Sequence, residues 1–455
     1  MVQSNHNKAC FQGDYPDPSI VKVEAYYYVV FSSMKYRPAL PMFRSKDLID
    51  WEFMGSCLQE FDRDVWAPEL AVINNKLCIY FYAENENWVI TCEDINKFSW
   101  SAPLSLDIQE YIDPGFLRHE NKNYLFLGKG MMCELSEDGL KRTSPLRKVF
   151  PDFVVDNDED IEGDFIESPK LMVHQDMIYY TVTTGGTAGP ATGHRVLSAR
   201  SKSVEGPWEF SPYNPIIVAK DRNDDWYCQG HATIFDADDG WYSIYHAYQK
   251  DAFLWGRQCL IEKIEWDNHG WFYRTHQCIA GKEKTFVQLQ NEFVSFKEQA
   301  KVETIENGFR LYAKGNTMGN SEKLLFPLAK NSFELECDLS VLKDTVAGIT
   351  MFYNEEHCIG IGIETNKIKI IRHNELLNEI SCDQLVRKIK ISVKDFYWKS
   401  YVSYDGETFV KINNVIDIST FNHNSYGGFM SLRPGFFCYG KQGVEFSNLK
   451  LSWGE

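Results

Sequence analysis

Short apolar runs, rich in aromatic and β-branched residues, follow one another along the first part of the chain and are separated by Asn, Asp and Gly. Runs of this kind, bounded by turn residues, predict β-strands. No stretch of twelve or more residues with a helical hydrophobic period interrupts them. The clearest predicted strands cover residues 25–31, 77–82, 124–127, 177–182 and 241–246.

Each of these strands follows a distinctive polar segment that begins about ten residues earlier. The segments begin near Asp17, Trp66, Asp113, Glu167 and His231, so the spacings are 49, 47, 54 and 64 residues. A repeat of about 40 to 50 residues is typical of a β-propeller, in which each repeat forms one four-stranded blade. We interpret the two longer spacings as loop insertions. The sequence therefore predicts an all-β fold with a five-bladed propeller.

The propeller topology has a consequence for the five residues at which the segments begin. The first strand of each blade lines the central axis, and the starts of these strands converge on one mouth. Although the five residues are far apart in the sequence, we expect them to surround a single cavity.

The remainder of the chain shows a different pattern of short strands. Apolar and polar residues alternate in residues 333–339, 368–371, 388–393 and 444–451, between turns rich in Gly and Asn. This alternation predicts an antiparallel β-sandwich. A short polar stretch at residues 281–284 marks the expected boundary. The predicted domains are a propeller at residues 1–285 and a sandwich at residues 286–455.

Composition excludes several classes of protein. The 455 residues are 44% hydrophobic, 24% charged and 15% aromatic, which excludes a disordered, collagen-like or coiled-coil chain. No apolar run approaches the roughly 18 to 20 residues of a membrane span. Residues 1–285 hold 28 Lys and Arg against 43 Asp and Glu, and so carry most of the formal charge of −17. Such an acidic chain is unsuited to nucleic acid.

Aromatic rings and carboxylates together suit a neutral polyhydroxylated ligand, although many strands also need many aromatic residues simply for packing. The 12 Cys include no Cys-x-x-Cys pair, and the chain begins without the pattern of a signal peptide. We therefore expect free, buried thiols and a cytoplasmic location. A mature periplasmic or secreted chain would share these features, so that alternative stays open.

Three acids at equivalent blade positions stand next to proline. Asp17 lies between Pro16 and Pro18, Asp113 precedes Pro114, and Glu167 lies two residues before Pro169. One Asp-Pro pair is more often a turn than a catalyst, but buried acids are costly unless they are paired or used. A protonated acid and an ionised base are what glycosidic cleavage requires, and a third carboxylate would raise the pKa of the acid.

These motifs, in this order, resemble those of glycoside hydrolase family 43, in particular members with a C-terminal β-sandwich that act as β-xylosidases or α-L-arabinofuranosidases. The resemblance covers essentially the whole chain and implies a five-bladed propeller followed by a concanavalin-like jelly roll. It is carried by Tyr-Pro-Asp-Pro-Ser at 15–19, Arg-Ser-Lys-Asp-Leu at 44–48 with Trp51, Val-Trp-Ala-Pro-Glu-Leu at 65–70, Ile-Asp-Pro at 112–114, Glu-Ser-Pro-Lys-Leu at 167–171, Gly-Gly-Thr at 185–187, Gly-His-Ala at 230–232 and Gly-Arg-Gln at 256–258.

The resemblance implies three catalytic roles. Asp17 would be the general base that activates water, and Glu167 the general acid. Asp113 would tune the pKa of Glu167 and orient it. Members of the family invert the configuration at the anomeric carbon, so a water must fit between the base and the sugar.

The resemblance also implies residues that contact the substrate or an ion. Arg257 would bind sugar hydroxyls or help to set Glu167, and Trp66 would form an apolar wall under a sugar ring. His231 stands where relatives place a histidine on the axis, often beside a cation or water. The glycine-rich loop 184–193 precedes His194, which we expect to face the site; His246 could do so too.

Each of these assignments has an alternative. Arg257 could be a structural ion-pair partner, and Trp66 could simply pack between blades. Many relatives have Glu-Gly-Pro where this chain has Ser168 after the acid. An acidic stretch at residues 156–164 precedes that motif and makes Glu162 a rival for the acid.

We therefore expect an inverting exo-glycosidase that releases xylose or arabinose from plant-derived oligosaccharides. No cofactor is required for this reaction, although calcium or another cation could lie near His231. The expected partner is an oligosaccharide, with no nucleic acid and no membrane, and the oligomeric state stays open. The alternative is a non-catalytic carbohydrate-binding propeller. A retaining fructan-cleaving propeller is disfavoured because the chain lacks the matching Asn-Asp-Pro and Arg-Asp-Pro pair.

Overall fold

The computed structural model describes residues 8–151, 163, 165–341 and 343–453 of the chain, which form two units. Unit 1 holds the described residues of Met1–Lys35, Ala39–Asp251 and Arg257–Glu283. Unit 2 holds those of Tyr36–Pro38, Ala252–Gly256 and Lys284–Glu455. The description that follows treats each unit by itself.

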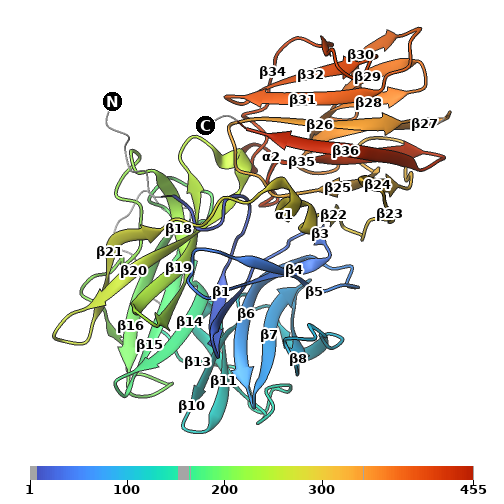
Figure 1. Cartoon of the computed structure of the whole chain (residues 1–455). Helices are drawn as coiled ribbons and strands as arrows, with labels where there is room; N and C mark the ends of the chain where they lie inside the picture. The colour runs from blue at the N-terminus through green and yellow to red at the C-terminus, as the bar shows by residue number, and fades with distance from the viewer. Residues whose placement is uncertain (1–7, 152–162, 164, 342, 454–455) are drawn as a thin grey trace. The chain divides into compact units, whose positions relative to one another are not determined.

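Five four-stranded antiparallel sheets make up the described part of unit 1, and each is built from consecutive strands of the chain apart from the displaced β3 (Figure 1). This is the predicted five-bladed propeller. The blades are β1(Ser19–Val23), β2(Tyr26–Val30), β4(Ala39–Ser45) and β5(Glu52–Leu58); β6(Val65–Ile73), β7(Lys76–Ala83), β8(Glu86–Cys92) and β9(Leu104–Gln109); β10(Gly115–His119), β11(Lys122–Leu127), β12(Met131–Leu135) and β13(Arg147–Lys148); β14(Glu167–His174), β15(Met177–Thr184), β16(Arg195–Ser201) and β17(Glu209–Phe210); and β18(Trp226–Ala237), β19(Gly240–Gln249), β20(Arg257–Trp266) and β21(Phe272–Ile279).

A separate hydrophobic core lies between each pair of neighbouring blades. The core between the first two blades packs Val30 and Met42 against Ile79 and Phe81. Three further clusters join the second blade to the third, the third to the fourth and the fourth to the fifth. A fifth cluster joins the last blade to the first, so the ring of blades is closed. Because every blade is covered on both faces, its second strand is almost entirely buried.

The N-terminal segment helps to close this ring. Phe11 forms an isolated antiparallel bridge with Cys259 of β20 in the fifth blade. Its ring is 1% exposed and lies 4.9 Å from that of Phe31 and 5.1 Å from that of Phe43, both of the first-blade region, measured between centroids. The segment therefore joins the first and last blades through both backbone and side chain.

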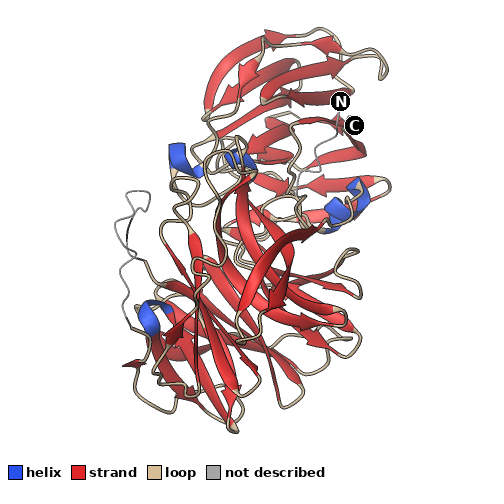
Figure 2. Ribbon diagram, turned by 90° about the vertical axis from the view of Figure 1, so that its left-hand side faces the viewer, coloured by secondary structure: helices blue, strands red, loops and turns tan. Residues whose placement is uncertain are grey.

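Unit 2 contains the predicted sandwich, with two antiparallel sheets in its described residues. One sheet has the order β23-β24-β36-β26-β31-β32-β33, with β34 also paired to β32, and the other has the order β25-β35-β27-β28-β29-β30. Figure 2 shows these layers as strands, with few helices. The strands are β23(Val302–Ile305), β24(Gly308–Leu311), β25(Glu322–Leu325), β26(Ser332–Ser340), β27(Thr345–Phe352), β28(Cys358–Glu364), β29(Lys367–Arg372), β30(Glu375–Ser381), β31(Lys388–Lys394), β32(Tyr397–Ser403), β33(Val410–Lys411), β34(Ile416–Asp417), β35(Arg433–Gly440) and β36(Val444–Ser452).

Short elements complete the two units. In unit 2, β3(Tyr36–Arg37) pairs with β22(Ser295–Phe296). The helices are α1(Phe286–Asn291) and α2(His423–Tyr426), and single 3₁₀ turns occur at η1(Gly128–Gly130) and η2(Phe253–Trp255). A capping box starts α1, because the side chains and backbones of Thr285 and Gln288 bond reciprocally.

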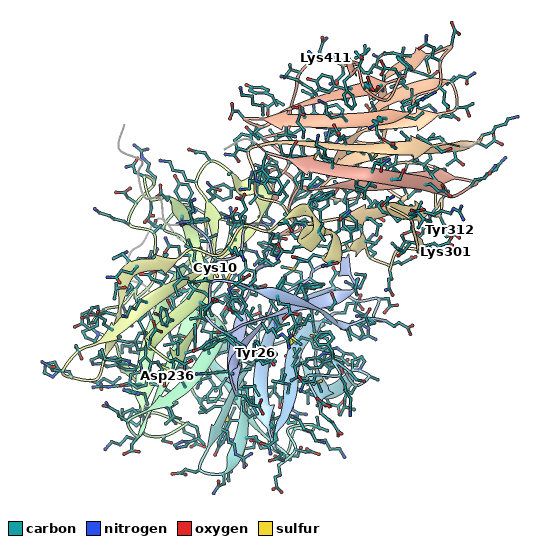
Figure 3. All side chains as sticks on the ribbon, in the orientation of Figure 1. Cys10, Tyr26, Asp236, Lys301, Tyr312 and Lys411 are labelled. Carbon is teal, nitrogen blue, oxygen red and sulfur yellow. The ribbon has the colours of Figure 1, made fainter. Side chains whose placement is uncertain are left out.

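Charged side chains project from the surface, whereas most cysteines lie in the interior. In Figure 3, Lys301 and Lys411 project from unit 2, whereas Cys10 lies inside unit 1, where it is 5% exposed. All twelve cysteines are free, and ten of them are buried, which confirms the expectation of unpaired, buried thiols. In the described residues, no helix has the length and apolarity needed to cross a membrane.

Candidate active site

Four of the five residues predicted to surround one cavity stand at or near the start of the first strand of a blade, and the fifth, His231, lies in the middle of β18. A non-glycine residue with a positive φ lies at or next to each of the five: Asp17 (55°), Ala67 (46°), Asp113 (58°), Ser168 (57°) and His231 (56°). The ladder between first and second strand is also irregular near Trp66, Glu167 and Gly230. Positive φ is unfavourable for L-residues and is retained where the fold needs it, often at functional sites.

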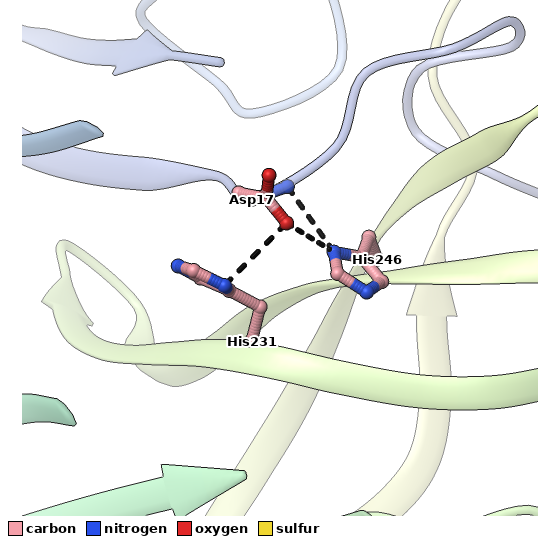
Figure 4. Close-up of side chains that lie close together, drawn as sticks. All are labelled: Asp17, His231 and His246. Carbon is pink, nitrogen blue, oxygen red and sulfur yellow. Dashed lines mark hydrogen bonds and ion pairs between the residues drawn. The ribbon is translucent and has the colours of Figure 1, made fainter. Parts of the chain in front are cut away.

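Asp17 is the most heavily bonded of the three acids (Figure 4). Its carboxylate is 5% exposed; Arg257 Nη1 donates to Oδ1 over 2.9 Å, and Ser32 Oγ donates to Oδ2 over 2.5 Å. Two histidine Nδ1 atoms also face Oδ1, at 3.1 Å for His246 and 3.5 Å for His231. Arg257 is therefore the ion-pair partner of Asp17, and its expected contacts with sugar hydroxyls or Glu167 stay predictions.

These contacts decide the charge of Asp17. Burial by itself would raise the pKa of its carboxyl group, but the Arg257 guanidinium and the nearby donors outweigh burial and hold the pKa well below its usual range. Asp17 is therefore ionised at neutral pH. Since Oδ1 is held by Arg257 and Oδ2 accepts one hydrogen bond from Ser32, the second lone pair of Oδ2 can accept a proton.

Asp113 lies in a second buried cluster, beside the turn that follows Glu167. Its Oδ2 accepts a hydrogen bond of 2.9 Å from the backbone N–H of Ser168, and Ser168 Oγ lies 3.4 Å from the same oxygen. Burial and the negative charge of Asp17 raise the pKa of Asp113 to about 7, against the opposing effects of Ser168 and Lys170. Asp113 is thus far more easily protonated than Asp17.

Glu167 is the first residue of β14, and 24% of its side chain is exposed. Burial of the carboxyl group, followed by the charges of Asp113 and Asp17, raises its pKa well above the usual value, and Arg257 opposes this only in part. Like charges on two neighbouring carboxyl groups favour a shared proton. The site therefore combines one ionised acid, Asp17, with one acid able to stay protonated, Glu167.

Two buried histidines are packed behind these carboxylates. The rings of His194 and His246 stack at 5.5 Å between centroids, with planes 3° apart. His194 Nδ1 lies 2.9 Å from the carbonyl oxygen of Gly185 and 3.9 Å from Glu167 Oε1. Gly230 is needed here because a Cβ at that position would lie 2.0 Å from His194 Cδ2. His194 thus lies near Glu167, and its expected contact with the substrate stays a prediction.

Protonation of both rings is disfavoured. Burial lowers the pKa of His194 to about 3, and it also lowers the pKa of His246. The backbone N–H of Asp17 lies 3.1 Å from His246 Nδ1, and His246 Nε2 faces Thr187 Oγ1 at 3.2 Å. Among the described residues, His194 Nε2 has no hydrogen-bond partner; it is buried and packs against Gly230.

The remaining predicted residue, Trp66, begins the second blade's inner strand. It pairs with Tyr82 in the sheet and is half-buried. Its neighbour Ala67 donates its backbone N–H to Ser32 Oγ over 2.6 Å, and Ser32 in turn donates to Asp17. Trp66 is thus one residue away from the network of Asp17. Its role as a wall under a sugar ring stays a prediction.

Farther along the inner strands, a buried ion pair joins the second blade to the fourth. Lys170 Nζ lies 2.6 Å from Glu69 Oε2, and the two side chains are 3% and 9% exposed. Ser19 Oγ donates to the same Glu69 oxygen over 2.9 Å. A cavity of about 20 Å³ beside this pair is large enough for one water molecule. These contacts fix the spacing of the strands that present the carboxylates.

Asp17, His231 and His246 could together hold a metal ion, because their ligand atoms lie within 4.8 Å of one another. The Arg257 guanidinium, however, already occupies Oδ1 of Asp17 and would repel a second cation there. His231 Nε2 offers a separate donor: it is buried and has no hydrogen-bond partner in the described part of the chain. A cation beside His231 therefore stays a prediction, and an ion shared by all three residues fits poorly.

Sequence reasoning did not find every residue of this network. Ser32 and Ser168 were not proposed as site residues, because a serine after a strand or beside proline carries no specific signal. His246 was proposed only as an alternative, yet it contacts Asp17 directly. The rival acid, Glu162, lies outside the described residues.

Comparison with known proteins places these residues in a family. A model described as "Glycosyl hydrolases family 43" matches residues 7–272, and one described as "Beta xylosidase C-terminal Concanavalin A-like domain" matches residues 295–448. A β-xylosidase from Bacillus subtilis is 26% identical over 319 residues, which cover 60% of this chain and 56% of the relative. The chain thus spans only about half the length of that relative. A xylosidase/arabinosidase from Butyrivibrio fibrisolvens is 25% identical, with 95% of each chain covered.

Solved structures share the fold of the whole chain. A xylan β-1,4-xylosidase from Bacillus halodurans superimposes with a TM-score of 0.85 at 19% identity, covering 98% of this chain and 100% of that one. A family 43 protein from Bacillus licheniformis gives a TM-score of 0.86 at 19% identity, with 99% and 100% covered. At this identity the likeness shows the fold alone.

Proposed function

The chain belongs to glycosyl hydrolase family 43, and on that premise we propose that it is an inverting exo-glycosidase that cleaves β-xylosidic or α-L-arabinofuranosidic linkages in plant-derived oligosaccharides. One observation carries the proposal: Arg257 bonds to Asp17, whereas no hydrogen bond from a described residue reaches the Glu167 carboxylate. These surroundings agree with a lowered pKa for Asp17 and a raised pKa for Glu167. An acid and a base of this kind are what inverting hydrolysis needs.

In the proposed reaction, Glu167 donates its proton to the glycosidic oxygen as the bond to the anomeric carbon breaks. Asp17 accepts a proton through Oδ2 from a water that attacks the opposite face of the sugar. Arg257 keeps Asp17 ionised and oriented through its bond to Oδ1. Both protons are then accounted for, and the product has the inverted configuration.

The sugar specificity rests on the relatives. Curated relatives include a β-xylosidase, a xylosidase/arabinosidase and a "Non-reducing end alpha-L-arabinofuranosidase" from Bacteroides ovatus, all at 25 to 26% identity. Pentosides are therefore the first substrates to test. A panel of 4-nitrophenyl β-D-xyloside, α-L-arabinofuranoside and β-D-galactoside, with the anomer of the first product followed by NMR, tests both the sugar and the stereochemistry. A retained configuration would contradict the mechanism.

Substitution of the two acids tests their roles. Asp17→Asn and Glu167→Gln should each lower kcat/KM by about 10²- to 10⁴-fold, the usual contribution of a positioned acid or base, while the fold persists. Glu167→Gln should retain more activity on 2,4-dinitrophenyl glycosides, because this leaving group needs little protonation. Full activity in either variant would rule out the assigned role.

Glu162→Gln is the control for the acid. If Glu167 is the acid, Glu162→Gln should show the same dependence on the leaving group as the unmodified protein. If Glu162 is the acid instead, this variant should lose activity on poor leaving groups, and Glu167→Gln should not.

A further inference from the structure

Ser168 adopts a backbone conformation that glycine would adopt at lower cost. It lies between Glu167 and Pro169, has a φ of 57° and is 1% exposed. An L-residue is disfavoured at this φ, whereas glycine is not. Because Ala67 has a positive φ at the same point of its blade, the conformation alone assigns no role, and the argument rests on the contacts of the Ser168 hydroxyl group.

The hydroxyl group of Ser168 lies between two side chains of the site. Its Oγ is 2.7 Å from His231 Nδ1 and 3.4 Å from Asp113 Oδ2, and the backbone N–H of Ser168 donates to that same Oδ2 over 2.9 Å. Ser168 thus presents two potential donors to one carboxylate oxygen.

The neighbours of His231 indicate the direction of these hydrogen bonds. His231 Nδ1 faces Ser168 Oγ at 2.7 Å and Asp17 Oδ1 at 3.5 Å. A nitrogen that faces two oxygens, one of them a carboxylate, is best satisfied when it carries the proton. Ser168 Oγ then accepts from His231, and its own hydrogen is directed to Asp113.

Glu167 receives no comparable support. Among the described residues, no hydrogen bond reaches its carboxylate, and the nearest histidine nitrogen, His194 Nδ1, is 3.9 Å away and engaged with Gly185. Of two neighbouring acids that share a proton, the one with donors is more easily ionised. Donors from Ser168 therefore favour the arrangement with Asp113 ionised and Glu167 protonated.

We propose that Ser168 is a positioning residue whose hydroxyl group, held by His231, keeps Asp113 ionised so that the shared proton stays on Glu167. This inference rests on the proposed function, because it assigns the proton to the general acid. Other groups also influence the ionisation of Asp113 and Glu167. Asp17, Lys170 and Arg257 do so through their charges, and Tyr82 and His194 are titratable neighbours.

Two variants distinguish an effect of the Ser168 hydroxyl group from an effect of its backbone conformation. Ser168→Ala keeps the Cβ and its conformational cost and removes only Oγ, whereas Ser168→Gly removes both. Ser198→Ala is a matched control, because Ser198 is a 1%-exposed serine of the same blade whose Oγ has no partner in the described residues. The measurement is kcat/KM against pH on 4-nitrophenyl and phenyl glycosides of the sugar preferred by the unmodified protein.

Loss of the hydroxyl group should affect acid catalysis selectively. We expect kcat/KM of both Ser168 variants to fall about tenfold on phenyl glycosides, which is the effect of losing one hydrogen bond to a charged group. The fall should be smaller on 4-nitrophenyl glycosides. Without its donor, Asp113 ionises at higher pH, so the acidic limb of the profile should move up by about one pH unit. Ser198→Ala should match the unmodified protein.

Each other result has a defined meaning. An equal loss at every pH and on both leaving groups would show a merely structural role, and an unchanged profile in Ser168→Gly would overturn the inference even if Ser168→Ala did not fold. A shift in Ser168→Gly alone would assign the effect to the backbone and also overturn it. If the unmodified protein hydrolyses no glycoside, the proposed function fails and this inference with it.

Discussion

The three acids of the mouth have different charges because their immediate neighbours differ. Asp17 faces an arginine and a serine hydroxyl group, Asp113 faces one backbone N–H and a longer contact to a hydroxyl group, and Glu167 faces mainly other acids. Burial alone would raise the pKa of all three. The number and charge of the donors therefore decide which acid is ionised.

We expect ionisation of the buried Asp113 to lower the free energy of unfolding of the protein at neutral pH. Its pKa is raised to about 7 in the folded protein, so folding opposes its ionisation above the ordinary value of 3.8. The folded state binds more protons between these values, so stability falls as pH rises through them. Asp113→Asn should therefore stabilise the protein at pH 8, by up to about 4 kcal/mol, and much less at pH 4.

Urea denaturation of Asp113→Asn and the unmodified protein at the two pH values measures this difference. Activity should fall in the variant while stability rises, as expected for a group retained for function. A variant less stable than the unmodified protein at pH 8 would show that the Asp113 carboxylate is well compensated in the fold.

The raised pKa of Glu167 should also limit activity at high pH. In the proposed role of general acid it would be active only when protonated, and its raised pKa favours the protonated form at pH values where an ordinary glutamic acid would be ionised. We expect kcat/KM on phenyl glycosides to fall as pH rises through this pKa. Asp17, whose pKa is lowered, should stay ionised across the whole profile.

Glycosides with a better leaving group test whether the alkaline limb of the pH profile comes from Glu167. On 2,4-dinitrophenyl glycosides, Glu167→Gln should show no alkaline limb, because no proton donor titrates. An alkaline limb that persists in this variant would have to come from another group.

The sequence pattern indicates three candidate acids, but it does not indicate the neighbouring residues that determine whether each acid is ionised. Asp17, Asp113 and Glu167 recur at equivalent positions beside proline, and the structure shows Asp17 and Asp113 joined to the network by hydrogen bonds. Ser32 and Ser168 are common residues without a repeat, and their importance lies in contacts between blades. Such contacts depend on how the strand starts converge, which no local pattern reveals.

At the scale of elements, the strands predicted with most certainty are the second strands of the five blades. The predicted range 77–82 lies within β7, 177–182 within β15 and 241–246 within β19. These strands are buried on both faces between neighbouring blades, so their apolar runs are long and visible. Outer strands such as β13 and β17 span two residues each, and no sequence pattern of that length is distinctive.

Closure of the ring should depend on the N-terminal segment. Phe11 contacts the first-blade region through its ring and the fifth blade through its backbone, and it is 1% exposed. Removal of a large buried ring leaves a cavity and costs about 3–5 kcal/mol. We therefore expect Phe11→Ala to lower the free energy of unfolding by that amount, as measured by urea denaturation.

Ile49→Ala is the control for this measurement, since Ile49 is 46% exposed and its truncation should change stability by less than about 1 kcal/mol. If Phe11→Ala were as mild as the control, the last blade would be held by its core alone and the segment would be dispensable.

At the scale of the molecule, the two units are not consecutive pieces of chain. Lys284–Glu455 belongs to unit 2, and so do Tyr36–Pro38 and Ala252–Gly256, although these two short segments lie between strands of the propeller. Sequence alone could not show this, because three or five residues in a loop carry no hydrophobic period. The chain therefore passes several times from one unit to the other, once between Gly256 and Arg257.

This connection predicts that a residue of unit 2 supports both stability and activity. Trp255 is 1% exposed, its Nε1 donates to Asn331 Oδ1 over 2.8 Å, and its ring lies 6.3 Å from that of Phe333. Arg257, two residues later, holds Asp17. Trp255→Ala should cost about 3–5 kcal/mol of stability, from cavity formation, and should also lower kcat/KM, because the segment before Arg257 loses its anchor.

Trp255→Phe is the matched variant, since it keeps an aromatic ring and removes only the outer part of the indole and its N–H. We expect it to retain most of the activity and to lose less stability than Trp255→Ala, as followed by urea denaturation and kcat/KM at temperatures where each variant is folded. If Trp255→Ala destabilises the protein but leaves kcat/KM unchanged in its folded state, Arg257 is held by unit 1 alone. A loss of activity that exceeds the loss of folded protein would instead show that the anchor in unit 2 orients the arginine on which the base depends.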